Sequence, residues 1–474
     1  MNPIQLLPEI VMACMALLFF GASLGRVRTA TLSAMALIFS ALAMAAALCA
    51  YDQTGMLFFD CYRLDPLSQL FKLFITGGLF LVISATPGVR GIDEKLRPEY
   101  FFFLSTGTFG LLCLVSCHEL LTMLLSLEIA SFSLNVMIPF RHRSSDHRRH
   151  MEASIKYFMF GVMSTGIMLY GMSYLFGLAH STHLVELLSS MPYLLRHEPL
   201  ALVAMIMLLT GFFFKLSLFP LHFLTPDVYE GAANETACYI ATLPKVTAIC
   251  VLIRLSYLCG PAPDRINLVL ATFAVLSMTI GNFSALVQND IKRMLAYSSI
   301  AHAGYVMLGI LCMDELGFAA AVYYTAGYLL MNLACFYVIY QLAPRGTNIT
   351  FAHLQGLCRR SPLLAFTLAT AAFGMTGIPP TIGFTGKFLI FTAAINRGFY
   401  GLVILAVVNA ALSAFFYLKM VRAAYCQEDD GSEAISLPLS AVLLGVVLVV
   451  AIILAGVLPQ GLMGLARLAV AGMG

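Results

Sequence analysis

The chain is poor in charged residues. Only 11% of its 474 residues are Asp, Glu, Lys or Arg, against about 25% in soluble domains, while 60% are hydrophobic. The mean hydropathy is +0.89. These values exclude a soluble globular protein. Because a membrane helix needs about 20 apolar residues, the chain is long enough for roughly ten spans or more.

The sequence also lacks any concentration of positive charge and any metal-type cysteine spacing. The formal net charge is +3, and Lys and Arg are dispersed in short gaps, so nucleic acid is excluded as a partner. The 12 cysteines form no C-x-x-C or C-x-x-C-H motif, as iron–sulfur, zinc and c-type haem sites would require. We therefore expect no metal or cofactor in this chain.

Charged, proline-containing and glycine-containing gaps divide the chain into fourteen apolar segments. The first basic residue, Arg26, follows the first segment, so this segment is expected to stay as a helix rather than to be a cleaved signal peptide. The sequence thus predicts an all-α polytopic membrane protein with about 14 spans, at 5–25, 29–50, 66–87, 99–117, 118–140, 152–179, 199–220, 235–259, 266–287, 293–312, 316–341, 361–397, 399–425 and 436–458.

Basic residues are distributed unequally between the two sides of the predicted membrane. With an external N-terminus, sixteen Lys and Arg residues, Lys292 among them, fall in cytoplasmic gaps and five fall in external gaps. This is the positive-inside asymmetry. It predicts a multi-pass protein of the cell inner (plasma) membrane with both termini on the external, periplasmic side.

Two blocks of equal length indicate an internal repeat. Residues 99–259 and 265–425 each contain five predicted spans, and an odd number of spans inverts the second block relative to the first. The predicted parts are an N-terminal three-helix segment (1–98), a first five-helix repeat (99–259), a second, inverted repeat (265–425) and a C-terminal helix (426–474).

The fourth span of each block, which is span seven or span twelve of the chain, is interrupted by proline. The interruptions are KLSLFPLHFLTP from Lys215 and GMTGIPPTIGFTGK from Gly374. Proline removes backbone donors that neighbouring protein or water must replace. Discontinuous helices in matching positions predict an ion pathway at the repeat interface, and proline kinks without a function are the alternative.

Charged groups also occur inside spans, where they are costly. Glu128 lies about ten residues into the fifth span, and we expect it to form an ion pair with Lys215. The alternative is an ion pair that only fixes helix packing. Lys245 and Lys387 have no obvious carboxylate partner, so we interpret them as amines that exchange protons. Three further cations lie near span ends and are expected to extend to the membrane surface: Lys72, Lys156 and Arg254.

Two histidines are further candidates, because imidazole titrates near neutral pH. His302 lies about ten residues into the tenth span, and His222 follows Pro220 in the broken seventh span. A hydrogen-bonded structural histidine is the alternative for each. The predicted site residues are Glu128, Lys215, Lys245, Lys387, His302 and His222.

Longer motifs around these residues resemble the antiporter-like membrane subunits of respiratory complex I, the NADH-quinone oxidoreductases. Within this family the chain is most similar to the N-type subunits, because position 387 is lysine rather than glutamate and no long lateral helix follows the last span. The resemblance covers essentially the whole chain. Its motifs are Leu127-Glu128, Phe214-Lys215, Phe219-Pro220-Leu-His222, Pro226–Gly231, Lys245, Asp290–Tyr305 with its Ala-His pair, Gly377–Pro380 and Gly383–Lys387.

The resemblance implies a non-redox subunit of a proton-translocating NADH:quinone oxidoreductase, a translocase of the respiratory chain. Protons would move along a midplane series of Glu128, Lys215, Lys245 and Lys387. NADH, FMN, iron–sulfur clusters and quinone would be bound by partner subunits. The expected partners are other membrane-arm subunits, especially M, K and J and the lateral helix of subunit L, together with the lipid bilayer.

The charge pattern suggests how such a relay would work. At about 4 Å and an effective dielectric constant near 20, a contact between Glu128 and Lys215 is worth on the order of 4 kcal/mol. Making or breaking this contact would switch Lys215 between holding and releasing a proton, which would pass by water and His302 to the other lysines. A subunit of a Na+/H+ antiporter or of an energy-converting hydrogenase would carry the same arrangement. A passive scaffold would not depend on Lys245 or Lys387.

Overall fold

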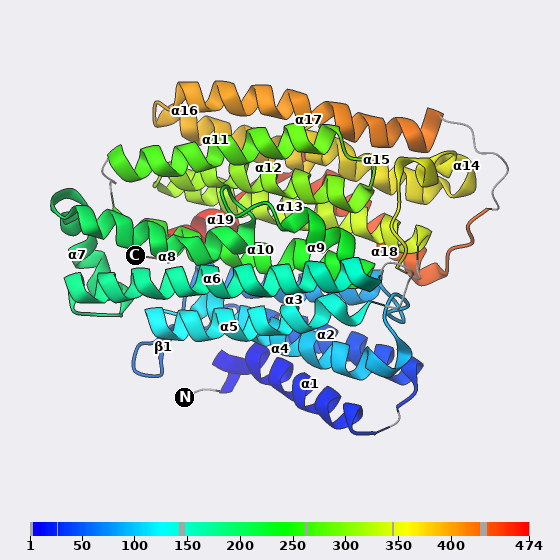
Figure 1. Cartoon of the computed structure of the whole chain (residues 1–474), viewed down its shortest axis with the longest axis horizontal. Helices are drawn as coiled ribbons and strands as arrows, with labels where there is room; N and C mark the ends of the chain where they lie inside the picture. The colour runs from blue at the N-terminus through cyan, green and yellow to red at the C-terminus, as the bar shows by residue number, and fades with distance from the viewer. Residues whose placement is uncertain are drawn as a thin grey trace.

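The computed structural model describes residues 3–25, 27–141, 147–260, 264–343, 346–426 and 434–473, without the side chains of 147–150 and 264. Most of these residues form helices that run along the long axis of the molecule (Figure 1). Helix α1 lies at one edge, and α16 and α17 lie at the opposite edge (Figure 1). Helix α7 and strand β1 lie at one end of the long axis, and α14 lies towards the other.

The helices follow the predicted order of segments. The N-terminal part contains η1 (Pro3–Leu6), α1 (Leu7–Ser23), α2 (Thr29–Cys49), a hairpin of β1 (Gly55–Leu57) and β2 (Tyr62–Leu64), and α3 (Pro66–Ala85). Next come η2 (Glu94–Leu96), α4 (Arg97–Ser116), α5 (Leu120–Met137), η3 (Ile138–Phe140), α6 (His147–Ala179), α7 (Leu184–His197), α8 (Pro199–Leu216), α9 (Thr225–Gly231) and α10 (Asn234–Tyr257). The remaining elements are α11 (Asp264–Leu286), α12 (Ile291–Leu311), α13 (Glu315–Leu342), η4 (Phe351–Leu354), α14 (Leu357–Arg360), α15 (Pro362–Thr376), α16 (Ile382–Asn396), α17 (Tyr400–Cys426), α18 (Leu439–Val457) and α19 (Pro459–Ala471).

The predicted membrane fold is confirmed. In the described part of the chain, 13 helices are long and apolar enough to cross a membrane, and they match thirteen of the fourteen predicted spans. The other predicted span, 361–397, consists of two shorter apolar helices, α15 and α16. The seventh span consists of α8 and, after a break, the short helix α9. Spans seven and twelve are therefore discontinuous, as the proline pattern predicts.

The two repeats share a close helix crossing. A Cβ atom on Gly110 of α4 would lie 2.8 Å from the backbone nitrogen of Ala130 in α5. A Cβ atom on Gly281 of α11 would lie 2.8 Å from the backbone nitrogen of Ala301 in α12. Small residues allow membrane helices to approach this closely. The first two helices of each repeat thus cross at a glycine in the same way, whereas the exact part boundaries at 98, 259, 265 and 425 stay predictions.

Three helices form the centre of the molecule. Helix α10 is buried along its whole candidate span, and α12 and α13 are buried along nearly all of theirs. By contrast, α1, α2, α17 and α18 each bury only about a third of their span. Large apolar side chains are exposed on these outer helices, as a lipid-facing surface requires. The central helices are therefore where polar groups can be held away from lipid.

Two features of the fold were not predicted. Helix α7 lies between α6 and α8, and it is too short and too polar to be found by a search for spans. Helix α19 follows α18 and packs against both α3 and α13. The part predicted to hold one C-terminal helix (426–474) thus holds a second helix at 459–471, whose apolar residues recur at helical spacing and bury one face.

Two of the three cations expected to extend to the surface are instead buried in ion pairs. Lys72 Nζ lies 2.7 Å from Glu9 Oε1, with no exposed side-chain surface on the lysine. Arg254 Nη2 lies 2.7 Å from Asp65 Oδ1. Burial opposes ionisation of Asp65, but Arg254 and Ser68 outweigh it and hold the pKa of this carboxyl below its ordinary value.

The two buried ion pairs connect helices of the N-terminal segment with each other and with α10. Glu9 belongs to α1 and Lys72 to α3, while Asp65 caps α3 and Arg254 belongs to α10. Glu9 also accepts a hydrogen bond from Tyr62 at 2.7 Å. Glu9 is buried, whereas Glu128, about ten residues into the fifth predicted span, is only half-buried.

Candidate functional site

The first helix break places Lys245 at the carbonyl end of α8. This helix ends at Ser217, whose φ of 62° is left-handed. Lys245 reaches over from α10, and its Nζ donates to the Leu216 carbonyl oxygen at 3.1 Å and to Ser217 Oγ at 3.0 Å. The ammonium group thus lies at the negative end of the α8 dipole, and it replaces backbone donors that the break removes.

The second break has the same geometry. Helix α15 ends at Gly377, whose φ of 92° is also left-handed. Lys387 of α16 donates from Nζ to the carbonyl oxygens of Met375 at 2.8 Å and Thr376 at 3.0 Å. A glycine is required here, because the backbone is left-handed and a Cβ atom would lie 3.2 Å from Lys387 Cδ. In both breaks, a buried lysine therefore binds the residue before the left-handed position.

The structure does not show the predicted contact between Glu128 and Lys215. No ion pair within 4.0 Å joins these two described residues, and both side chains are only half-buried. Glu128 Oε1 accepts a hydrogen bond from Thr165 at 2.7 Å. Lys215 Nζ donates to the Tyr157 hydroxyl at 3.3 Å and lies 5.4 Å from the centroid of the Tyr157 ring. Helix α6 supplies both of these partners.

A small cavity connects Lys215 with Lys245. It has a volume of about 20 Å3 and is lined by both lysines, Ser217, Thr225 and Tyr229, among others. A buried water needs about 10–15 Å3 and two to four polar partners. The cavity is therefore large enough for one water molecule.

His302 lies at the centre of a buried hydrogen-bond network. Its Nδ1 contacts the Tyr324 hydroxyl at 2.5 Å, and its Nε2 contacts the Tyr417 hydroxyl at 2.9 Å. The Tyr417 hydroxyl also bonds to Ser298 Oγ. These side chains are all buried. The sequence did not identify the tyrosines, because the 20 tyrosines of the chain show no spacing that separates these two from the rest.

The network approaches both breaks. On one side, the Tyr229 hydroxyl lies 3.3 Å from Ser299 Oγ, and Tyr229 lines the cavity that holds Lys215 and Lys245. On the other side, Lys387 Nζ lies 4.8 Å from the centroid of the Tyr305 ring, which is 6.1 Å from the His302 ring. Three of the predicted residues, Lys245, His302 and Lys387, thus lie in one buried series, and the half-buried Lys215 lies at its first end.

His222 lies apart from this series. It belongs to the segment between α8 and α9, and its ring stacks on Phe219 with centroids 5.7 Å apart. Its Nδ1 atom is buried and has no hydrogen-bond partner. The structure therefore places His222 at the first break but brings it into no polar contact with the lysines.

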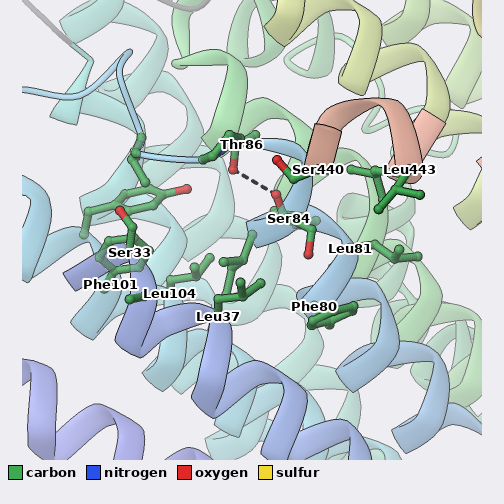
Figure 2. A pocket seen from close by; sticks show the side chains of 18 of the residues that line it. Ser33, Leu37, Phe80, Leu81, Ser84, Thr86, Phe101, Leu104, Ser440 and Leu443 are labelled. Atoms are coloured by element: carbon green, nitrogen blue, oxygen red, sulfur yellow. Dashed lines mark hydrogen bonds between the residues drawn. The ribbon is translucent and has the colours of Figure 1, made fainter. Parts of the chain in front are cut away.

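A much larger cavity lies outside the series. It has a volume of about 490 Å3 and lies between α2, α3, α4 and α18 (Figure 2). Figure 2 shows Leu37, Phe80, Leu81 and Leu443 around it, with a few hydroxyl groups such as that of Ser33. None of the described residues that line it is charged. This cavity therefore has no group that could take part in the lysine series.

Comparison with known proteins places the chain in a family. Residues 117–413 match the family described as "NADH:quinone oxidoreductase/Mrp antiporter, TM". The chain is 43% identical to NADH-quinone oxidoreductase subunit N 2 of Opitutus terrae, over 96% of this chain and 95% of that protein. It is 42% identical to the protein of the same name from Solidesulfovibrio magneticus, over 98% of both.

Solved structures agree with this similarity. A chain of respiratory complex I from Thermus thermophilus is 29% identical, with a TM-score of 0.83 and coverage of 97% of this chain and 99% of that chain. A chain of the Mrp complex from a Dietzia species is 18% identical, with a TM-score of 0.87 and coverage of 100% and 98%, and so shares the fold. The chain therefore belongs to the antiporter-like family of membrane subunits, among the N subunits of NADH-quinone oxidoreductase.

Proposed function

We propose that the chain translocates protons across the membrane through the buried lysine series, driven by redox chemistry in other subunits. The observation that carries this proposal is the pair of buried lysines, Lys245 and Lys387, at the carbonyl ends of two broken helices. A buried amine is costly in a membrane and marks an ion or proton pathway. Two such amines, at the breaks of helices that hold matching positions in an inverted repeat, fit a proton carrier better than a scaffold.

The proton moves between Lys215 and Lys245 through the water that fits the small cavity. From there it passes through Tyr229, Ser299 and the hydroxyl groups around His302. Lys387 is the end of the series and exchanges with one aqueous side. Glu128 acts on Lys215 when a movement of α6, or of a neighbouring subunit, brings the two side chains together.

The chain acts without bound redox cofactors of its own. NADH, FMN, iron–sulfur clusters and quinone belong to partner subunits, as the cysteine spacing also suggests. The partners are other membrane-arm subunits, which we propose to be subunits M, K and J and the lateral helix of subunit L. The large number of apolar side chains exposed on the outer helices fits both lipid and such neighbours.

The unequal distribution of basic residues supports an orientation. We propose that the protein lies in the bacterial inner membrane with its basic loops in the cytoplasm and both termini outside. In Figure 1, the two termini lie towards the same end of the long axis, as an even number of spans requires.

Proton pumping by assembled variants tests the function. Lys245→Met and Lys387→Met are made in the complete complex, and acidification of membrane vesicles is measured against NADH oxidation by quinone. We expect both variants to assemble with their NADH-oxidising partners and to lose most pumping per NADH. Full pumping by either assembled variant would contradict the lysine series.

A further inference from the structure

Two charged residues are buried at the starts of the helices that carry the series. Glu235 is the second residue of α10, the helix that holds Lys245. Lys292 is the second residue of α12, the helix that holds His302. Neither residue has any exposed surface. The prediction that Lys292 is a loop residue was wrong, because α12 begins at Ile291 and Lys292 Nζ reaches Ala232 in the loop before α10.

Glu235 has only part of its hydrogen-bonding capacity satisfied. Its Oε1 accepts from the backbone nitrogen of Gly91 at 2.8 Å, whereas its Oε2 is buried without a partner. The neighbouring Asn234 donates from Nδ2 to the Ala343 carbonyl oxygen at 2.9 Å, but its Oδ1 is also buried without a partner. Buried polar atoms are nearly always satisfied, and ordered water fills this role where protein does not.

The hydrogen-bonding capacity of the Lys292 ammonium group is also only partly satisfied. Its Nζ donates to the Ala232 carbonyl oxygen at 2.9 Å, and no carboxylate lies within 4.0 Å of it in the described part of the chain. An ammonium group has three donors. Lys292 therefore keeps donors for water.

The two residues lie on helices that also carry members of the lysine series. Ser299 follows Lys292 by two helical turns, so both lie on the same face of α12, about 10 Å apart. Ser299 bonds to Tyr229, which lines the cavity shared by Lys215 and Lys245. Glu235 is about 15 Å from Lys245 along α10. From Glu235 and Lys292, helices α10 and α12 thus run towards the middle of the membrane.

Two opposing effects act on the Glu235 carboxylate. The N-terminal end of a helix attracts negative charge, and Lys292 and Arg97 add positive charge nearby. Desolvation opposes the same charge and makes proton uptake by the carboxylate easier. A carboxylate held between these opposing effects can accept and release a proton.

We propose that Glu235 and Lys292 form the site at which protons enter the lysine series from the face that carries the basic loops. The Glu235 carboxylate accepts a proton from water held by Lys292 and becomes a neutral carboxylic acid, while this water regains a proton from the aqueous phase. When this proton passes on towards Tyr229 and Lys245, the carboxylate is restored. The inference rests on the proposed function, because it supplies the protons that the series carries.

The test uses Glu235→Gln in the complete complex. Glutamine keeps an oxygen for the Gly91 backbone nitrogen and nearly the same shape, but it cannot carry the proton. We expect an assembled complex with pumping and coupled NADH oxidation reduced several-fold. Glu235→Asp should keep part of the rate, and added azide or formate should raise the rate of NADH oxidation by the detergent-purified Gln variant, because small weak acids can deliver protons in place of the carboxylate.

Gly91→Ala provides a second variant with every ionisable group intact. Its Cβ atom would lie 2.6 Å from Glu235 Oε2 and would displace the carboxylate. We expect slower pumping that weak acids again restore. Wild-type rates in Glu235→Gln, or a loss that Glu235→Asp shares fully and weak acids leave unchanged, would overturn the proposal.

Lys387→Met separates this proposal from the proposed function. If Lys387→Met loses pumping while Glu235→Gln pumps normally, the series stands and its uptake site is elsewhere. If Lys387→Met itself pumps normally, the series fails, and with it the role of Glu235.

Discussion

At both helix breaks a lysine binds backbone carbonyl oxygens, but the two breaks differ in their number of lysines. At each break, an ammonium group binds the carbonyl oxygen before a left-handed residue, through Lys245 in one case and Lys387 in the other. The first break has a second amine, Lys215, and a cavity that fits a water molecule. At the second break, Lys387 faces an aromatic ring instead.

The origin of the lysine also differs. Lys245 comes from a neighbouring helix, α10, whereas Lys387 comes from α16, the second half of the broken helix itself. A movement of α10 relative to α8 would therefore open the first break, but the second break is held within one span. The comparison suggests that the first break is the adjustable one and the second is a fixed terminus.

Substitution of Lys387, at the second break, should have the largest effect on pumping. Lys387→Ala leaves the Met375 and Thr376 carbonyl oxygens without their donor, at a cost of about 1–3 kcal/mol for each buried unsatisfied group. We expect pumping to fall to near zero, with a lower melting temperature of the complex. Lys387→His should preserve some pumping. Full pumping by assembled Lys387→Ala would show that proton exchange at this position is not required.

Lys215→Ala should abolish most pumping with little effect on stability. Its amine makes only a hydrogen bond of 3.3 Å to Tyr157 and is half-buried, so it contributes little to packing. Vesicle acidification and thermal unfolding of the same preparation check both statements. A destabilised complex would mean that Lys215, like Lys245, supports the break.

Substitution of Glu128 should have a smaller effect on pumping. Glu128→Gln should impair pumping, and Glu128→Asp should keep part of it, if a carboxylate acts on Lys215. Thr165→Val removes the hydrogen bond that holds Glu128 away from the amine. This variant should keep or raise the coupling between NADH oxidation and pumping. Identical rates in the Gln and Asp variants would exclude a role for the charge.

The smallest effect on transport is expected from Asp65. Asp65→Asn leaves the buried Arg254 charge unpaired, which costs about 3–5 kcal/mol, so the complex should unfold at a lower temperature while assembled molecules still pump. The pKa of Asp65 is lowered in the folded protein. Its stabilising contribution is therefore present at neutral pH and is lost as the pH falls through that lowered pKa. Thermal unfolding at several pH values measures this loss, which Asp65→Asn should lack.

Much of this architecture could be predicted from the sequence, because hydrophobic length and proline position determine spans and breaks locally. Spans seven and twelve, with Lys245 and Lys387 beside their breaks, are examples. Partners across helices could not be predicted, because they depend on how the helices rotate. Lys72 and Arg254 have carboxylate partners from other segments, and the partner of Glu128 in this structure is a threonine.

Helix α19 has a consequence for synthesis of the protein. It packs on α3, and the carbonyl oxygen of Gly472 just beyond it accepts a hydrogen bond at 3.3 Å from Arg63, which precedes it by 409 residues. The ribosome therefore delivers α3 long before it delivers the helix that covers it. During this interval the N-terminal helices must be inserted and held by lipid or by the insertion machinery alone, and the bundle closes only when α19 arrives.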